Sequence, residues 1–203
     1  MDIFIIIGIL LLIFIIYNVF YLYSENIYVI SDIDGKSYLI RRGNNKSSKF
    51  LKDSANTLAV INANIIKLIN YLDETYSNDD SKNYFIKKLK QEYTPYIISE
   101  AAVDSRYTTY TIDKKDMRIC LRTRDKEENI YDINTLMYVV LHELSHLCNY
   151  DKYGNAIEGH GIEFKNIFKF LVEESMKLDI YNYTDYSLKP MEYCGIIIST
   201  SII

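Results

Sequence analysis

The chain has 203 residues, and its 23 lysines and arginines against 27 aspartates and glutamates give a formal net charge of −4 at pH 7. This length favours one domain with an appendage, and the acidic balance predicts no nucleic-acid partner, because a phosphate-binding surface needs a basic excess. The three cysteines, Cys120, Cys148 and Cys194, are odd in number and unpatterned in spacing, so they predict no disulfide framework and favour a reducing compartment.

An uncharged apolar run opens the chain and extends from Ile3 to Tyr23. As a helix these residues would be about 31 Å long, which is enough to cross the hydrocarbon core of a bilayer. No basic residue precedes the run and no small-residue cleavage site follows it, so the pattern of a cleaved signal peptide is missing. We expect residues 1–24 to be a transmembrane anchor and residues 25–203 to be the body of the protein.

Basic residues are found on the C-terminal side of this run and not before it. Lys36, Arg41 and Arg42 lie within about 20 residues of its end, and loops rich in lysine and arginine stay on the cytoplasmic side of a membrane. The expected localisation is a single-pass membrane protein with its body in the cytoplasm.

The first part of the body is predicted to hold a hairpin and two helices. Strands at residues 28–33 and 36–40 flank Asp34-Gly35, a pair that suits a two-residue type I′ turn. Apolar residues at three- and four-residue spacing from Ser48 to about Tyr76 predict a long amphipathic helix. A shorter helix is expected to follow, as far as about Gln91.

Two further strands are predicted at residues 107–112 and 117–123, around a polar turn. The second strand closely precedes the motif described below. In zinc peptidases a strand beside the metal commonly pairs with an extended substrate, because backbone hydrogen bonds hold a peptide straight. Met117–Thr123 is therefore the candidate substrate-binding strand, with an ordinary sheet strand as the alternative.

The strongest signal is the H-E-x-x-H motif formed by His142, Glu143 and His146. Its two histidines share one helix face and can bind one zinc ion, while the glutamate beside them can accept a proton from zinc-bound water. The helix is expected to begin near Ile133 and to be buried, because it is apolar on most sides. Cys148 points away from the metal face and is predicted to be a core residue.

A catalytic zinc site needs a third protein ligand. His160 is the favoured candidate, because Gly159 and Gly161 permit a sharp turn that delivers its imidazole to the metal. Glu163 and Glu158 remain as alternatives. Zinc would then lower the pKa of a bound water, and the glutamate of the motif would act as general base in amide hydrolysis; the residue that stabilises the oxyanion stays open among the tyrosines.

Three segments together carry a family likeness: Arg118–Arg122, Val139–His146 and Gly159–Phe164. They resemble the WLM-domain zinc peptidases and their SprT-like relatives, and in particular the short WLM-like proteins of nucleocytoplasmic large DNA viruses. The resemblance covers roughly residues 107–171, and the tail at residues 190–195 is similar as well.

The resemblance implies roles for individual residues. His142, His146 and His160 take the zinc-ligand positions, Glu143 takes the catalytic position, and Phe164 matches the aromatic residue that packs behind the third ligand. Residues 147–158 look like an insertion relative to the cellular enzymes. Those enzymes act on proteins crosslinked to DNA, and they carry additional binding segments that this chain does not show. We therefore expect this chain to share their proteolytic activity but not their substrate.

We therefore predict an α+β, zincin-like metallopeptidase domain with a small sheet and a buried H-E-x-x-H helix, tethered by one transmembrane helix. Its predicted function is zinc-dependent cleavage of proteins or peptides near a host or virion membrane. The alternatives are a noncatalytic zinc scaffold and a virion membrane interaction protein that keeps the peptidase fold. The tail at residues 196–203 is expected to be a final strand or a packed extension, since it is too short for a second span.

Overall fold

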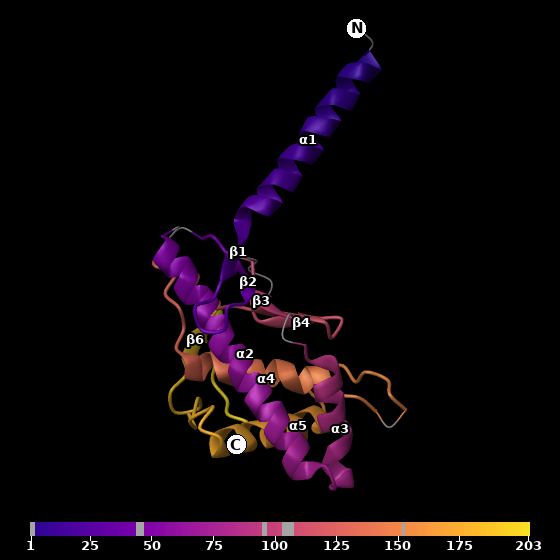
Figure 1. Cartoon of the computed structure of the whole chain (residues 1–203), viewed down its shortest axis with the longest axis vertical. Coiled ribbons are helices and arrows are strands. Elements are labelled where there is room, and N and C mark those ends of the chain that lie inside the picture. The colour runs from indigo at the N-terminus through magenta and orange to yellow at the C-terminus, as the bar shows by residue number, and fades with distance from the viewer. Residues whose placement is uncertain (1–2, 44–46, 95–96, 103–107, 152) are drawn as a thin grey trace.

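The computed structural model describes residues 3–43, 47–94, 97–102, 108–151 and 153–203. In these residues five helices and three small sheets form an α+β fold, as expected from the sequence. Figure 1 shows one helix standing clear of a body in which the other helices pack together beside the strands.

The apolar N-terminal run forms one helix, α1 (Ile3–Glu25), which projects away from the body (Figure 1). Between Ile3 and Phe20 none of its residues is buried inside the structure. By length and composition this stretch could cross a membrane.

An antiparallel hairpin follows, made of β1 (Asn26–Ile30) and β2 (Ser37–Arg41). The expected two-residue type I′ turn is wrong: Gly35 has a positive φ of 68°, but Asp34 does not. The first strand ends earlier than predicted and the second begins one residue later. The loop between them is wider because the side chains of Ser31 and Asp34 accept backbone N–H groups within it.

The helices of the body make its largest layer, and they are α2 (Ser48–Tyr76), α3 (Asp80–Glu92), α4 (Ile133–Cys148) and α5 (Ile162–Lys177). The sequence predicted α2 and α3 with closely similar bounds. Helix α4 packs against the other three and against the sheet, so its sides are covered by neighbours (Figure 1). The motif helix is therefore the centre of the core.

A three-stranded sheet lies beside α4, made of β3 (Ile98–Glu100), β4 (Tyr110–Ile112) and β5 (Asp116–Ile119). The order is β3-β5-β4, and β5 pairs parallel with β3 and antiparallel with β4. Met117–Thr123 is thus wrong as the substrate strand, because β5 uses both of its edges inside the sheet and ends at Ile119.

The edge strand next to the motif helix is β4 instead. It pairs with β5 on one side, and in the described part of the chain no strand pairs with its other side. The predicted start of this strand at Tyr107 lies outside the described residues. The sequence also missed β3, whose three residues are too few for a periodic pattern.

The C-terminal segment forms a second hairpin, β6 (Met191–Tyr193) and β7 (Ile196–Ile198). This confirms the expected final strand. Its two-residue turn is Cys194-Gly195, with φ values of 51° and 86°, as the hairpin turns with two left-handed residues require.

A disulfide joins Cys194 in this turn to Cys120, which directly follows β5. The prediction of no disulfide framework was therefore wrong. The two cysteines are 74 residues apart, and only the packing of the hairpin against the end of β5 brings their Cα atoms to 6.5 Å. Cys148 is free and buried, which confirms its prediction as a core residue.

Candidate metal centre

Helix α4 presents His142 and His146 one turn apart on the same face. Asp132 caps the helix by accepting the backbone N–H of Thr135 at 3.0 Å. Between and around the two histidines the helix is buried, while both imidazoles are only half-buried. In the second half of the helix, the two positions that are not buried therefore carry the two imidazoles of the motif.

His160 joins them from the loop that precedes α5. Gly159 before it has a φ of 80°, so the chain makes the sharp turn that the sequence suggested. The Nε2 atom of His160 lies 3.0 Å from Nε2 of His142 and 3.1 Å from Nε2 of His146.

The three histidines form one group of possible metal ligands, with ligand atoms all within 4.8 Å of one another. Among the described residues Glu158 and Glu163, the alternatives for the third position, do not belong to this group.

The nitrogen positions fit a tetrahedral zinc ion. Two nitrogens that each lie about 2.0–2.1 Å from zinc at tetrahedral angles are about 3.3 Å apart, close to the two measured separations. A neutral imidazole carries only one N–H, so three nitrogens that converge bring lone pairs together, and a shared cation relieves their repulsion. Three histidines also leave the fourth position open, as in catalytic zinc sites.

Burial keeps two of these rings neutral, as metal ligands must be. It lowers the pKa of His142 to about 3 and that of His146 to about 4, and repulsion from the neighbouring histidines adds to the effect. At neutral pH both rings are therefore available to bind a metal without first losing a proton.

An aromatic pair fixes the rings from behind. The ring of Phe164, on the first turn of α5, lies 4.3 Å from that of His146, 4.7 Å from that of His160 and 4.9 Å from that of His142. Phe168, one turn later, lies 5.3 Å from the ring of His142. Phe164 packs against His160 as expected, and this packing restricts the rings to their convergent arrangement.

Glu143 lies beside the histidines and is only 7% exposed. One of its carboxylate oxygens accepts a hydrogen bond from the hydroxyl of Thr111 on β4, at 2.9 Å. Burial raises the pKa of Glu143 to about 7, and the hydrogen bond from Thr111 acts in the opposite direction. A carboxyl group with a pKa near 7 is suited to exchange protons at neutral pH.

Lys114 ties the sheet to the end of the motif helix. It sits at the turn between β4 and β5, and its ammonium group donates to the backbone carbonyls of His146 and Asn149. These carbonyls belong to the last turn of α4, where a cation is favourable. The contact holds β4 against the C-terminal end of the helix that carries the ligands.

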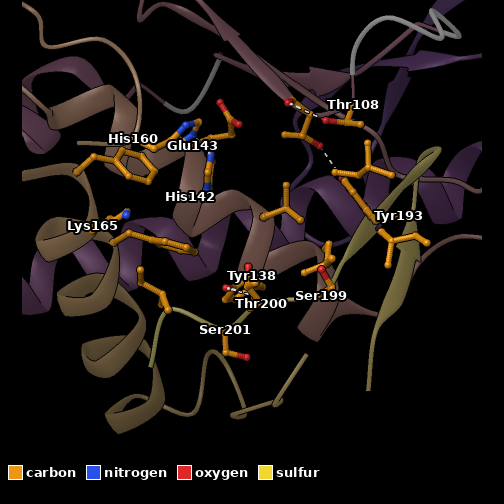
Figure 2. A pocket seen from close by; sticks show the side chains of 18 residues that line it. Thr108, Tyr138, His142, Glu143, His160, Lys165, Tyr193, Ser199, Thr200 and Ser201 are labelled. Atoms are coloured by element: carbon orange, nitrogen blue, oxygen red, sulfur yellow. Dashed lines mark hydrogen bonds between the residues drawn. The ribbon is translucent and has the colours of Figure 1, made fainter. Parts of the chain in front are cut away.

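The site opens into a cleft with two unlike halves. The first half is a largely apolar cavity of about 400 Å³. It extends from His142 and His160 to the C-terminal residues 196–202. Figure 2 shows His142, Glu143 and His160 on one side of it, with Tyr193 and Ser199 on the other. The second half, about 510 Å³, is lined by Lys114, Glu158 and β4.

Sequence reasoning found His142, Glu143, His146 and His160 but missed the residues that surround them. From the sequence, Thr111 is expected to be an ordinary strand residue and residues 196–202 an apolar tail, with no indication that either borders the site. Among the tyrosines left open as oxyanion donors, Tyr153 lies near the motif in sequence, but it is 78% exposed and lines neither half of the cleft. The glycine of Cys194-Gly195 could have suggested a turn with positive φ. Nothing in the sequence indicated that Cys194 forms a disulfide with Cys120.

Comparison with known proteins finds viral relatives. The uncharacterized protein R325 of Acanthamoeba polyphaga mimivirus is 38% identical over 208 aligned residues, covering 100% of both chains. The uncharacterized protein 136R of Invertebrate iridescent virus 6 is 32% identical over 48% of this chain and 51% of its own length. The uncharacterized protein 042R of Invertebrate iridescent virus 3 is 35% identical over 43% of this chain and 50% of its own.

These relatives all come from large DNA viruses. No family model matches the chain, and no solved structure matches it.

Proposed function

The chain belongs to the same family as protein R325 of mimivirus, and we propose that it is a membrane-anchored zinc endopeptidase of the zincin type. The observation that carries the proposal is the convergence of the Nε2 atoms of His142, His146 and His160 beside the buried carboxyl group of Glu143. A zinc ion held by three imidazoles supplies a water of lowered pKa and polarises a carbonyl group.

The residues of the chain supply the proton transfers. Glu143 accepts a proton from the attacking water, whose oxygen forms the new bond to the carbonyl carbon. Glu143 then returns that proton to the amide nitrogen as the carbon–nitrogen bond breaks. The hydrogen bond from Thr111 holds one carboxylate oxygen in place and leaves the other oxygen to take up the proton.

Strand β4 supplies the binding edge for an extended peptide. Its residue Thr111 lines the cleft together with His142 and His146, and no strand described in the structure pairs with the edge of β4 opposite β5. A peptide added at that edge gains backbone hydrogen bonds irrespective of its sequence. Its scissile carbonyl would pass over the three imidazoles.

The sequence likeness to WLM-domain and SprT-like peptidases supports the same reaction. A noncatalytic zinc scaffold is less well supported, because closed structural sites use four protein ligands and the group found here has three. An interaction protein that retains the fold would not need a buried, hydrogen-bonded Glu143.

The proposed place of action is a membrane surface. Helix α1 would be the single anchor, and Lys36, Arg41 and Arg42 favour a cytoplasmic body. The disulfide removes the cysteine argument for a reducing compartment, since disulfides persist in oxidising surroundings. The orientation therefore rests on the basic residues.

Expression in glycosylating cells tests this placement. The full chain should stay in the membrane fraction after alkaline carbonate extraction and should carry no glycan at Asn182, an exposed acceptor in the pattern Asn182-Tyr183-Thr184. Release by carbonate would refute the anchor. A glycan at Asn182 would place the body in the lumen, where the disulfide forms readily.

The enzymatic proposal is tested on the full chain in detergent micelles. Bound zinc and cleavage of reduced, carboxymethylated casein are measured for the wild type, for Glu143→Gln and for the control Glu163→Gln. We expect all three to bind zinc and only Glu143→Gln to lose activity, by at least about 100-fold, as for loss of general base catalysis. Zinc binding without cleavage by the wild type would favour the scaffold instead.

A further inference from the structure

The apolar half of the cleft has a feature that proteolysis alone does not require: its far wall is the C-terminal segment of the chain. Residues 196–202 line the cavity opposite His142 and His160, and Figure 2 shows Ser199, Thr200 and Ser201 along that wall. On the near side Val139 and Phe168 complete an apolar surface. The cavity therefore opens directly from the position of the proposed reaction.

The wall is firmly attached to the body. The disulfide between Cys194 and Cys120 fixes the start of the segment. The hydroxyl of Tyr193 donates to the carbonyl of Cys120 at 2.9 Å and is paired with Thr109 at 2.5 Å. Further along, the hydroxyl of Tyr138 on α4 donates to the carbonyl of Thr200 at 3.2 Å. Such attachments give the cavity a fixed shape, which selectivity requires.

From these observations we propose that the C-terminal segment is a specificity wall, and that the cavity takes a large apolar side chain of the substrate, such as Leu, Ile, Met or Phe. The proposal rests on the peptidase function proposed above. The volume of about 400 Å³ is within the range of formed ligand pockets and admits one such side chain with room for its backbone.

The direction of strand β4 assigns this side chain to one side of the scissile bond. The apolar cavity includes Thr108 and Thr109, just before β4, whereas the polar half includes Asp113 and Lys114, just after it. An added strand is more stable when antiparallel. The peptide then enters along the polar half and leaves along the apolar half, so the apolar side chain belongs to the residue that follows the scissile bond.

The polar half differs in chemistry and gives an internal contrast. Lys114 and Glu158 line it, and the ammonium group of Lys114 is already bound to carbonyls of α4. No strong apolar selection is expected there. Residues before the scissile bond should therefore vary more freely than the residue after it.

The first test maps cleavage sites. The zinc-loaded full chain in detergent digests reduced, carboxymethylated casein, and mass spectrometry identifies the new termini. Large apolar residues should be enriched directly after the cleaved bonds. Cleavage without that enrichment, or with enrichment before the bond instead, would overturn this inference while leaving the peptidase proposal intact; no cleavage at all would count against the peptidase proposal itself.

The second test measures binding without turnover. Two peptides that differ only by Leu or Ala after a mapped bond are titrated against the zinc-loaded Glu143→Gln variant. The Leu peptide should bind at least about tenfold more tightly, the size of effect that an apolar pocket provides for a few methylene groups. Equal affinities would overturn the inference.

The third test changes the wall. Ile196 lines the cavity and is 49% exposed, so Ile196→Lys should fold and place a cation there. The ratio of cleavage rates for the Leu and Glu versions of the peptide should shift toward Glu by at least about tenfold. Leu188→Lys, a control at a position 79% exposed and outside the cavity, should leave the ratio unchanged. A ratio taken on one protein sample does not depend on the folded fraction, and an unchanged ratio for Ile196→Lys would contradict the assigned wall.

Discussion

Helix α4 and the C-terminal hairpin β6–β7 border the same cleft, but they reach it in different ways. The helix places His142, Glu143 and His146 within five consecutive residues, and burial on its other sides orients them. The hairpin comes from the end of the chain and is held by a disulfide to Cys120, 74 residues earlier. The chemistry of the site is thus local, whereas the shape of its pocket depends on a distant attachment.

Because the ligand set and the pocket wall are held by different parts of the chain, metal binding and pocket shape should be separable by mutation. A change in the ligand set should abolish metal binding while the pocket wall stays in place. A change in the attachment of the hairpin should alter stability and selectivity while the metal stays bound. The predictions below concern the ligand set, the attachment of the hairpin and the hydrogen bond to Glu143, in that order.

The largest effect is expected from His160→Ala. Loss of a residue that supports a ligand typically costs about 10–100-fold in metal affinity, so loss of one of three ligands should cost more than about 100-fold. Titration with zinc, and the visible spectrum after cobalt substitution, measure this on the full chain. Glu163→Ala is the matched control; if it weakened zinc binding as much as His160→Ala does, the third ligand would have been assigned wrongly.

The next effect, on stability, is expected from breaking the disulfide. The double variant Cys120→Ala, Cys194→Ala should lose about 2–4 kcal/mol of unfolding free energy, because a long loop is no longer closed in the unfolded chain. Denaturant unfolding measures the loss, and Cys148→Ala is the control that removes a buried thiol without a bridge.

The same double variant separates selectivity from chemistry. Its zinc affinity should match that of the wild type, while its preference for Leu over Ala after the scissile bond should fall. In the wild type and in Cys148→Ala, a reductant should likewise lower the unfolding free energy and the preference for Leu. In the double variant, which has no disulfide to reduce, it should change neither. Equal loss of zinc would mean that the hairpin supports the ligands as well as the pocket.

The smallest effect is expected from Thr111→Val. This change removes the hydrogen bond to Glu143 and keeps the shape of the side chain, so kcat/KM should fall about tenfold, in the range for a hydrogen bond to a charged group. Thr111→Ser keeps the hydroxyl and should restore activity. If Ser and Val behaved alike, Thr111 would not position the carboxylate.

Comparison of predicted and observed elements separates what could be predicted from what could not. The long helices α2 and α4 were predictable, because their apolar periodicity and the cap residue Asp132 are local signals. The strands were poorly bounded, because β3, β4 and β5 have only three or four residues each. The order of strands in the sheet could not be predicted. For this reason the sequence favoured Met117–Thr123 as the substrate strand, whereas β4 is the strand at the edge of the sheet.

The turns show the same limit. Asp34-Gly35 has the residues of a type I′ turn, but nearby side chains close a wider loop, while Cys194-Gly195 forms the turn with two positive φ values. The residue types at the two central positions of a turn determine which turn conformations are possible. The packing of its flanking strands decides whether the pair is used in that way.

The sequence by itself determined the donor set of the site, because a helix places residues four apart on one face whatever surrounds it, and because a glycine beside His160 permits the turn that brings it back. Only the tertiary structure decided which strand borders the site, which cysteines pair and what closes the pocket. Those features depend on contacts between segments distant in the chain, which no local sequence pattern specifies.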